Sequence, residues 1–176
     1  MAMATWAIDP SHSEVTFKVK HLVISTVTGN FHKFEGAVEA VGEDFNGASA
    51  SFSLDVDSVN TNSADRDGHL KSGDFFDAEQ FPKITFANGK ITNSSGEYSL
   101  TGDLTIRDVT KSVTLDVDFG GVAKDPWGNT KAGFEITGKI PRKEFGLNWN
   151  APLETGGVLV GEDVRLVLNI QLAQQG

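Results

Sequence analysis

The sequence predicts an all-β fold: an eight-stranded antiparallel barrel with a short helical insertion between strands three and four. Eight stretches alternate apolar and polar residues with a period of two, as strands with one buried face do. Residues 60–80 break this rhythm with a charged pattern typical of a short helix. A length of 176 residues is normal for one domain, so residues 1–176 are expected to form a single domain.

The eight predicted strands follow one another with short connections. The residues between the second and third strands, 42–47, read Gly-Glu-Asp-Phe-Asn-Gly and predict a turn, and Asn-Ser-Ser-Gly at 93–96 closes a hairpin. A two-sheet sandwich would use the same strands, but we favour the barrel, which leaves no exposed edge. The predicted strands cover 14–21, 29–41, 48–56, 84 onward to the hairpin turn, 98–106, 113–119, 134–140 and 164–172.

The second predicted strand, 29–41, contains a break in phase. Phe34 and the residues that alternate with it face inward, whereas Phe31 falls among polar residues. Because one extra residue in a strand moves the following side chains to the other face, we expect a bulge near Gly29 that turns Phe31 inward.

The inward positions combine small residues with aromatic ones. Either the two kinds interdigitate and fill the interior, as in an ordinary core, or the small residues leave a space that the aromatic residues line. A barrel of about eight strands is just wide enough for either outcome. The residues concerned are the small Ala40, Ala48, Ala50, Gly102, Ala132 and Gly138 and the aromatic Phe17, Phe34, Phe52, Phe86 and Phe134.

The insertion has the features of a capped helix followed by two aromatic residues. Asn62 or Ser63 is placed to cap the helix, and Asp65 lies near its positive end. Phe75 and Phe76 are adjacent, so they cannot both lie on one strand face. We expect one of them to plug or gate the barrel, or both to pin the insertion onto the barrel end.

Composition excludes several classes of partner. Lys and Arg total 15 against 24 Asp and Glu, which gives a formal charge of −9, so no nucleic-acid partner is expected. No run approaches the roughly 18 apolar residues of a membrane span, so no membrane insertion is expected. The sequence contains no cysteine and therefore neither a disulfide framework nor a thiolate site.

The amino-terminal residues bear on location. Residues 1–4 run directly into patterned residues from Trp6, which leaves no room for a basic start, an apolar stretch and a cleavage site. The expected compartment is the cytoplasm, or the periplasm if a leader was removed.

The polar residues give little support for catalysis or metal binding. Asp67 and His69 are two residues apart, a spacing that does not bring side chains together on a helix. His12 and Ser13 are adjacent, and adjacent strand residues face opposite ways. The 4 histidines lie in separate segments without the paired spacing of zinc ligands, so neither a metal nor a cofactor is expected.

Several motifs occur around the insertion. Residues 58–61, 66–71, 74–77 and 81–86 read Ser-Val-Asn-Thr, Arg-Asp-Gly-His-Leu-Lys, Asp-Phe-Phe-Asp and Phe-Pro-Lys-Ile-Thr-Phe. Together they resemble the signature segment of the YceI-like family of lipid-binding, lipocalin-like barrels. Further motifs agree in the same order: Trp-Ala-Ile-Asp-Pro-Ser-His-Ser at 6–13, Val-Lys-His at 19–21, Gly-Asp-Leu-Thr-Ile at 102–106, Val-Thr-Lys at 109–111, Asp-Pro-Trp-Gly at 125–128 and Arg-Lys-Glu-Phe-Gly-Leu-Asn-Trp-Asn at 142–150.

The resemblance implies an all-β, eight-stranded antiparallel lipocalin-like barrel with a short helical insertion between strands three and four. Its interior would bind a long apolar ligand (a polyisoprenoid, a quinone-type lipid or a fatty-acid-derived lipid) as a carrier, store or sensor, without a cofactor. A homodimer is also implied. The expected ligand contacts are Phe17, Val19, His21, Phe34, Phe52, Leu54, Phe75, Phe76, Phe86, Leu100, Phe134 and Trp149, with Arg66 and His69 as candidates for contact with the head group.

Two other functions stay open from the sequence. One is an enzyme that acts on a lipid or small molecule at the barrel mouth, for which Arg66 and His69 are the best candidates. The other is a closed scaffold, filled by its own side chains, that works through its dimer surface and has no tunnel. Trp127 lies in a Pro-Trp-Gly turn and is expected to anchor its loop or contact a second subunit.

Overall fold

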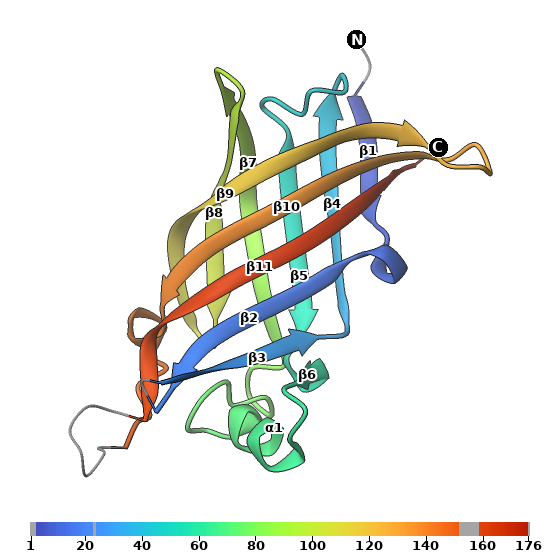
Figure 1. The fold of residues 1–176 in the computed structure, drawn as a ribbon. Coiled ribbons are helices and arrows are strands. Elements are labelled where there is room, and N and C mark those ends of the chain that lie inside the picture. The colour runs from blue at the N-terminus through green and yellow to red at the C-terminus, as the bar shows by residue number, and fades with distance from the viewer. Residues whose placement is uncertain (1–2, 23, 152–158, 176) are drawn as a thin grey trace.

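The computed structural model describes residues 3–22, 24–151 and 159–175, which form one antiparallel sheet rolled into a barrel, with a helix at one end (Figure 1). The helix is α1 (Ala64–Lys71), and the 3-10 helices are η1 (Pro10–His12), η2 (Val56–Ser58) and η3 (Arg142–Phe145). The strands are β1 (Met3–Ile8), β2 (Glu14–His21), β3 (Ser25–Phe31), β4 (Phe34–Val41), β5 (Ser49–Asp55), β6 (Val59–Asn60), β7 (Lys83–Ser94), β8 (Glu97–Ile106), β9 (Val109–Lys124), β10 (Thr130–Pro141) and β11 (Val160–Gln174).

The sheet closes because β11 has partners along both edges. One edge pairs with β10, and the other pairs with β1 (Ile8 opposite Leu172) and with β2 (Phe17 opposite Leu166). β1 and β2 are therefore two pieces of one strand, interrupted by η1. β3 with β4 and β5 with β6 are interrupted in the same way, so the strands of the described residues fill eight positions around a closed antiparallel barrel. The predicted fold class is confirmed.

Asp9 holds the interruption between β1 and β2 in place. Its carboxylate accepts hydrogen bonds from the Ser11 hydroxyl (2.7 Å), from His12 Nδ1 (2.9 Å) and from Lys131 Nζ (3.0 Å) on β10. Because Ser11, then His12, then Lys131 favour the charged form, the pKa of Asp9 lies well below its usual range. The short η1 turn is thus tied to a neighbouring strand.

The second predicted strand, 29–41, is two strands rather than one with a bulge near Gly29, so the expected bulge is wrong. An irregular break at His32 and Lys33 separates β3 from β4 and resets the alternation. Phe31 is consequently buried, with its ring centroid 5.4 Å from that of Phe17. Gly29 has a different role, because a Cβ there would lie 2.3 Å from the Phe17 ring.

The helix α1 begins where the sequence predicted. Ser63 is its N-cap residue and accepts a hydrogen bond from the Arg66 backbone N–H (3.3 Å), whereas Asn62 precedes the cap with a positive φ of 63°. α1 lies across one end of the barrel, hereafter the α1 end (Figure 1). Among the described residues, no helix is both long enough and apolar enough to cross a membrane.

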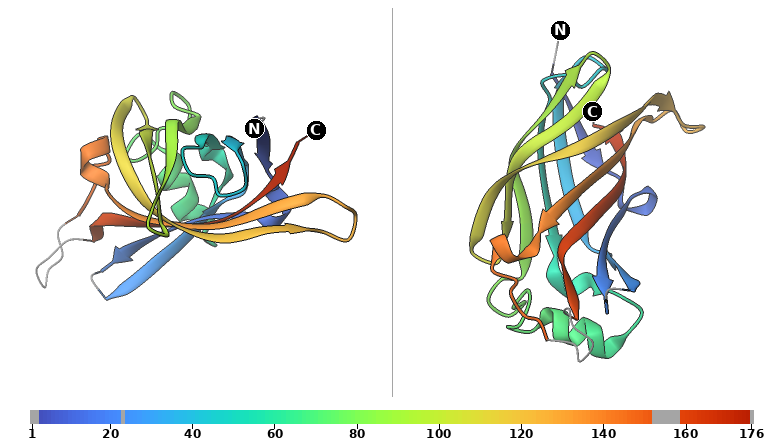
Figure 2. Two further views of the ribbon diagram at one scale, coloured as in Figure 1. Left: turned by 90° about the horizontal axis from the view of Figure 1, so that it is seen from above. Right: turned by 60° about the vertical axis from the view of Figure 1, so that its left-hand side comes forward.

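β9 and β10 are longer than predicted and extend as a hairpin beyond the rest of the barrel (Figure 2). At the turn, Asp125 accepts hydrogen bonds from the backbone N–H groups of Trp127 (3.0 Å) and Asn129 (2.9 Å), and these bonds, that of Asn129 first, lower the pKa of Asp125. The Trp127 side chain is 82% exposed. The ring therefore does not anchor its loop by packing.

Candidate functional site

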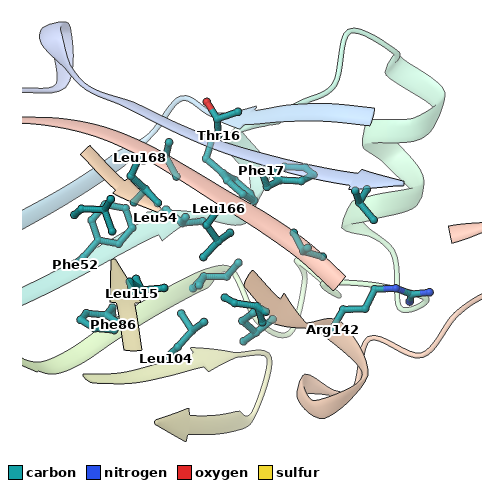
Figure 3. Close-up of a pocket in the computed structure, with 18 of the residues that line it drawn as sticks. Thr16, Phe17, Phe52, Leu54, Phe86, Leu104, Leu115, Arg142, Leu166 and Leu168 are labelled. Atoms are coloured by element: carbon teal, nitrogen blue, oxygen red, sulfur yellow. The ribbon is translucent and has the colours of Figure 1, made fainter. Parts of the chain in front are cut away.

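The barrel encloses a cavity of about 580 Å³ lined largely by apolar side chains. Its walls come from strands on all sides of the barrel, including Phe52 of β5, Phe86 of β7 and Leu166 of β11 (Figure 3). Ligand pockets in proteins typically measure about 300–1,000 Å³. The interior is thus neither a filled core, as the scaffold hypothesis requires, nor too small for a ligand.

Small residues in the wall explain how the interior stays open. A Cβ at Gly102 would lie 2.5 Å from the Phe86 ring, and a Cβ at Gly138 would lie 2.3 Å from Leu115 Cδ2. The tips of Phe86 and Leu115 therefore lie over the backbone of a neighbouring strand instead of pointing toward the barrel axis. Glycine lets large side chains lean on the wall and leaves the centre free.

The structure brings nearly all the predicted ligand-contact residues to this one cavity. Phe34 is the exception, because its ring stacks on Phe52 at a centroid distance of 6.2 Å and does not line the cavity. Leucines that were not singled out also line it, among them Leu104, Leu115 and Leu168, and each lies at an inward position of a predicted strand. The predicted residues that line the cavity are Phe17, Val19, His21, Phe52, Leu54, Phe75, Phe76, Phe86, Leu100, Phe134 and Trp149, together with Arg66 and His69.

The polar lining residues lie mainly at the α1 end. They come from the last residues of β2, from α1 and its cap, and from η3. The strands contribute mostly apolar side chains, so the cavity has an apolar length and a polar mouth. The polar residues at the mouth are Lys20, His21, Ser63, Asp65, Arg66, His69 and Arg142.

Three rings lie together at the mouth. The His69 ring is edge-on to Trp149 (4.6 Å between centroids) and to Phe75 (5.1 Å), and Phe75 lies 5.5 Å from Trp149. His69 Nε2 is 2.9 Å from a carboxylate oxygen of Asp74, which fixes the orientation of the imidazole. Phe76 turns instead toward Phe31, at 6.0 Å. Both adjacent phenylalanines thus line the cavity, but with different neighbours.

Arg66 is held by the segment that precedes its helix. Its Nε donates to the Thr61 hydroxyl (2.9 Å) and its Nη2 to the Thr61 carbonyl (2.6 Å). Asp67 accepts from the N–H and the hydroxyl of the same threonine, at 2.8 and 2.6 Å. Thr61 is buried, so this network fixes α1 against the barrel and places the guanidinium at the mouth.

Arg142 is a lining residue that the sequence did not identify. Its side chain is 2% exposed, and its N–H groups donate to main-chain carbonyls of Gly161 (2.8 Å), Leu147, Trp149 (3.0 Å) and Val160 (3.3 Å). Burial lowers its pKa, which the negative charge of Glu162 partly opposes. Figure 3 places it at one end of the group of apolar side chains. The cage of carbonyls ties η3, the segment of Trp149 and the start of β11 together.

The family can be assigned from these features together with a sequence match. The YceI-like domain matches residues 6–172, which include the insertion and all of the barrel except the first residues of β1 and the last residues of β11. The chain belongs to the YceI-like domain family. A UPF0312 protein of Staphylococcus aureus (strain USA300) is 44% identical over 164 residues, which are 93% of this chain and 94% of the relative.

Solved structures agree with this YceI-like fold. BcnA of Burkholderia cenocepacia superimposes with a TM-score of 0.75 at 24% identity, over 93% of this chain and 98% of that one. The YCEI protein of Campylobacter jejuni has a TM-score of 0.70 at 29% identity, over 90% and 91%. A polyisoprenoid binding domain from Saccharophagus degradans has a TM-score of 0.71 at 14% identity, over 97% and 98%.

Ser13 and His12 of this YceI-like chain make structural contacts. Ser13 donates to the Gln171 carbonyl and accepts from the Gln171 N–H, which links the end of η1 to β11. His12 lies outside the cavity, beside Asp9. Among residues 3–22, 24–151 and 159–175, no group of three or more histidine and acidic side chains is arranged to hold a metal ion.

Proposed function

We propose that this chain, acting as a single domain, binds one long-chain apolar ligand in the barrel interior as a carrier, store or sensor. The ligand is a polyisoprenoid, a quinone-type lipid or a fatty-acid-derived lipid. The observation that carries the proposal is the apolar cavity of about 580 Å³ with its polar residues at one end. The polyisoprenoid binding domain from Saccharophagus degradans, which has the same fold, supports the choice of ligand class.

A long tail supplies enough free energy for such binding. Each buried methylene contributes about 0.8 kcal/mol, so about twenty contribute about 16 kcal/mol. Association costs roughly 4–15 kcal/mol, and micromolar affinity requires a net gain of about 8 kcal/mol. Hydrophobic burial therefore supplies this net gain without a cofactor where association costs no more than about 8 kcal/mol.

The head group of the ligand lies at the α1 end. Among the described lining residues along the walls, only Thr16 and Ser51 carry a hydroxyl, whereas the mouth offers His21, Arg66 and His69. Arg142 adds a buried positive charge, and neither arginine forms an ion pair with a described carboxylate. A polar or anionic head group at the mouth would meet this charge, while the tail runs into the barrel.

We propose binding without turnover. The cavity walls are largely apolar, and a ligand enclosed by them needs no proton transfer. Thr61 orients Arg66 and Asp74 orients His69, and these contacts hold both side chains at the mouth as contacts for the head group. We further propose that the protein is a homodimer in the cytoplasm, to be checked by analytical ultracentrifugation and by fractionation of the native cells.

The test is whether lipid accompanies the protein. Native mass spectrometry and organic extraction of the purified protein are expected to reveal a copurifying prenyl or acyl lipid. Leu166→Trp fills the cavity and is expected to lower the lipid content. Leu22→Trp, at an exposed position outside the cavity, is the matched control and is expected to retain the lipid.

Two results would count against the proposal. One is a wild-type protein that is empty after purification and takes up no added prenyl or acyl lipid. The other is a Leu166→Trp protein that is folded, by its circular dichroism spectrum, and carries as much lipid as the wild type.

A further inference from the structure

The cavity is closed at the end opposite α1 by a cluster of aromatic side chains. The Phe45 ring lies 5.0 Å from Phe134, 5.1 Å from Trp6 and 5.4 Å from Phe119, measured between centroids. Phe134 lines the cavity, whereas the other three do not. Phe134 is therefore part of the end wall, and Phe45 stands behind it.

Phe45 reaches this position from a surface loop. It lies in the connection between β4 and β5, at the end of the barrel away from α1 (Figure 1), and both of its chain neighbours are exposed. Its own side chain is 0% exposed. Its φ of 58° is a left-handed conformation that disfavours any residue with a Cβ. A bulky residue persists in such a conformation where its surroundings determine it, and here the aromatic cluster does so.

Hydrogen bonds to the β7–β8 hairpin hold the loop in place. The Gly47 N–H donates to the Ile91 carbonyl (2.7 Å), and the Ile91 N–H donates to the Ala48 carbonyl (2.9 Å). The Asn93 N–H donates to the Asn46 side chain (2.9 Å), and the Tyr98 hydroxyl donates to the Asp44 carbonyl (2.8 Å). Ile91 itself lines the cavity. The loop is thus tied to the cavity wall, and Phe45 is a fixed plug.

We infer that Phe45 determines the longest tail that the cavity accepts. This inference rests on the proposed function, because it concerns how the same cavity selects its apolar ligand. A tail that enters at the polar mouth runs along the barrel until it meets Phe134, which Phe45 supports from behind. Methylenes beyond that point stay outside the cavity and gain nothing from burial.

Removal of the ring is expected to lengthen the cavity. Phe45→Ala leaves a space between Trp6, Phe119 and Phe134, next to the end wall. Each additional methylene that becomes buried strengthens binding about fourfold, so two methylenes strengthen it about fifteenfold. Phe45→Leu removes less volume and is expected to give a smaller extension.

The experiment measures affinity against chain length. Lauric, myristic, palmitic, stearic, arachidic and behenic acids, with geranylgeraniol and solanesol in parallel, compete with a fluorescent fatty acid for the delipidated wild type. Affinity is expected to rise with length and then level off or fall. In Phe45→Ala the rise is expected to continue for at least one further acid, with a gain of about fifteenfold over the wild type for that acid.

The matched control is Phe81→Ala, which removes the same atoms from a ring that does not line the cavity and lies under Arg107. It is expected to keep the wild-type length limit. Circular dichroism and thermal melting establish that each variant is folded. If Phe45→Ala does not fold, the chain-length limit of Phe45→Leu is compared with that of the wild type instead.

Failure of this inference and failure of the proposed function give different results. If the wild type binds the probes but both Phe45 variants keep its length limit, the role of Phe45 is wrong and the proposed function stands. A shifted limit in Phe81→Ala would equally overturn the assignment to Phe45. If the wild type binds no member of either series, the proposed function is wrong, and the inference falls with it.

Discussion

Replacement of the buried Arg142 by methionine is expected to destabilise the protein strongly. Methionine keeps most of the length and volume of the side chain but removes all five N–H donors. The carbonyls of Leu147, Trp149 and Gly161 would then lose their Arg142 partner in a site where the arginine is 2% exposed, whereas the Val160 carbonyl keeps its hydrogen bond from Asn150 Nδ2 (2.8 Å). The expected loss of stability comes from carbonyl acceptors left without a donor, rather than from a lost contact in the cavity.

The magnitude follows from the number of close contacts. Three of the carbonyls accept at 3.0 Å or less, and the fourth, that of Val160, retains its donor Asn150. At about 1 kcal/mol for each of the three orphaned acceptors, the free energy of unfolding falls by about 3 kcal/mol. For a protein of this size that corresponds to a fall in Tm of at least about 6 °C.

Thermal melting and urea unfolding, followed by circular dichroism, measure the effect. Lys143→Met is the matched control, because Lys143 is the next residue of η3, is 49% exposed and pairs on the surface with Glu162 (2.9 Å). It is expected to change the free energy of unfolding by less than about 1 kcal/mol. If Arg142→Met melts within about 2 °C of the wild type, the carbonyl cage does not stabilise this end of the barrel.

Three further predictions concern single residues. Asp9→Asn is expected to lower the free energy of unfolding at neutral pH. Because the folded pKa of Asp9 is depressed, the stabilisation by Asp9 is present above the unfolded pKa of about 3.9 and is lost as pH falls toward the folded pKa. Urea unfolding at several pH values should therefore show that the difference between variant and wild type narrows in acid, and a constant difference would refute this. Trp149→Ala removes a ring beside His69 and Phe75 and is expected to speed release of a bound fluorescent lipid in stopped-flow measurements; an unchanged rate would show that the ring does not narrow the mouth. Trp127→Ala is expected to leave the free energy of unfolding within about 0.5 kcal/mol, since the ring is exposed, and a larger change in urea unfolding would mean that the hairpin tip makes stabilising contacts.

The strand pattern was predictable because alternation is a local property. Residues 48–56 and 98–106 alternate strictly in the sequence and correspond to β5 and β8. The N-cap at Ser63 was likewise predictable, since a capping side chain acts on a backbone N–H only three residues away. The break at His32 and Lys33 was not predictable, because no Gly, Pro or Asn occupies either position and it appears in the sequence only as a shift of phase.

The candidate site was predictable in part, because the alternation along each strand identifies the side chains that face the barrel interior. Phe17, Phe52 and Phe86 were expected inside and do line the cavity, whereas Phe34 shares the inward phase but packs on Phe52. Their role as ligand contacts stays a prediction. Arg142 could not be placed, because an arginine after a strand is usually exposed and its burial depends on carbonyls from two later segments.

The sequence by itself determined that this chain forms antiparallel strands with one buried face and a capped helix at an insertion, since period-two alternation, turn residues and capping residues act over a few positions. Tertiary structure alone decided that the sheet closes into a barrel rather than a sandwich, and that the barrel is hollow and closed at one end. Whether an interior is filled depends on how the tips of side chains from distant strands meet, as Phe86 meets Gly102. Likewise Phe45, a turn residue in the sequence, becomes a buried plug only when the β4–β5 loop meets Trp6, Phe119 and Phe134.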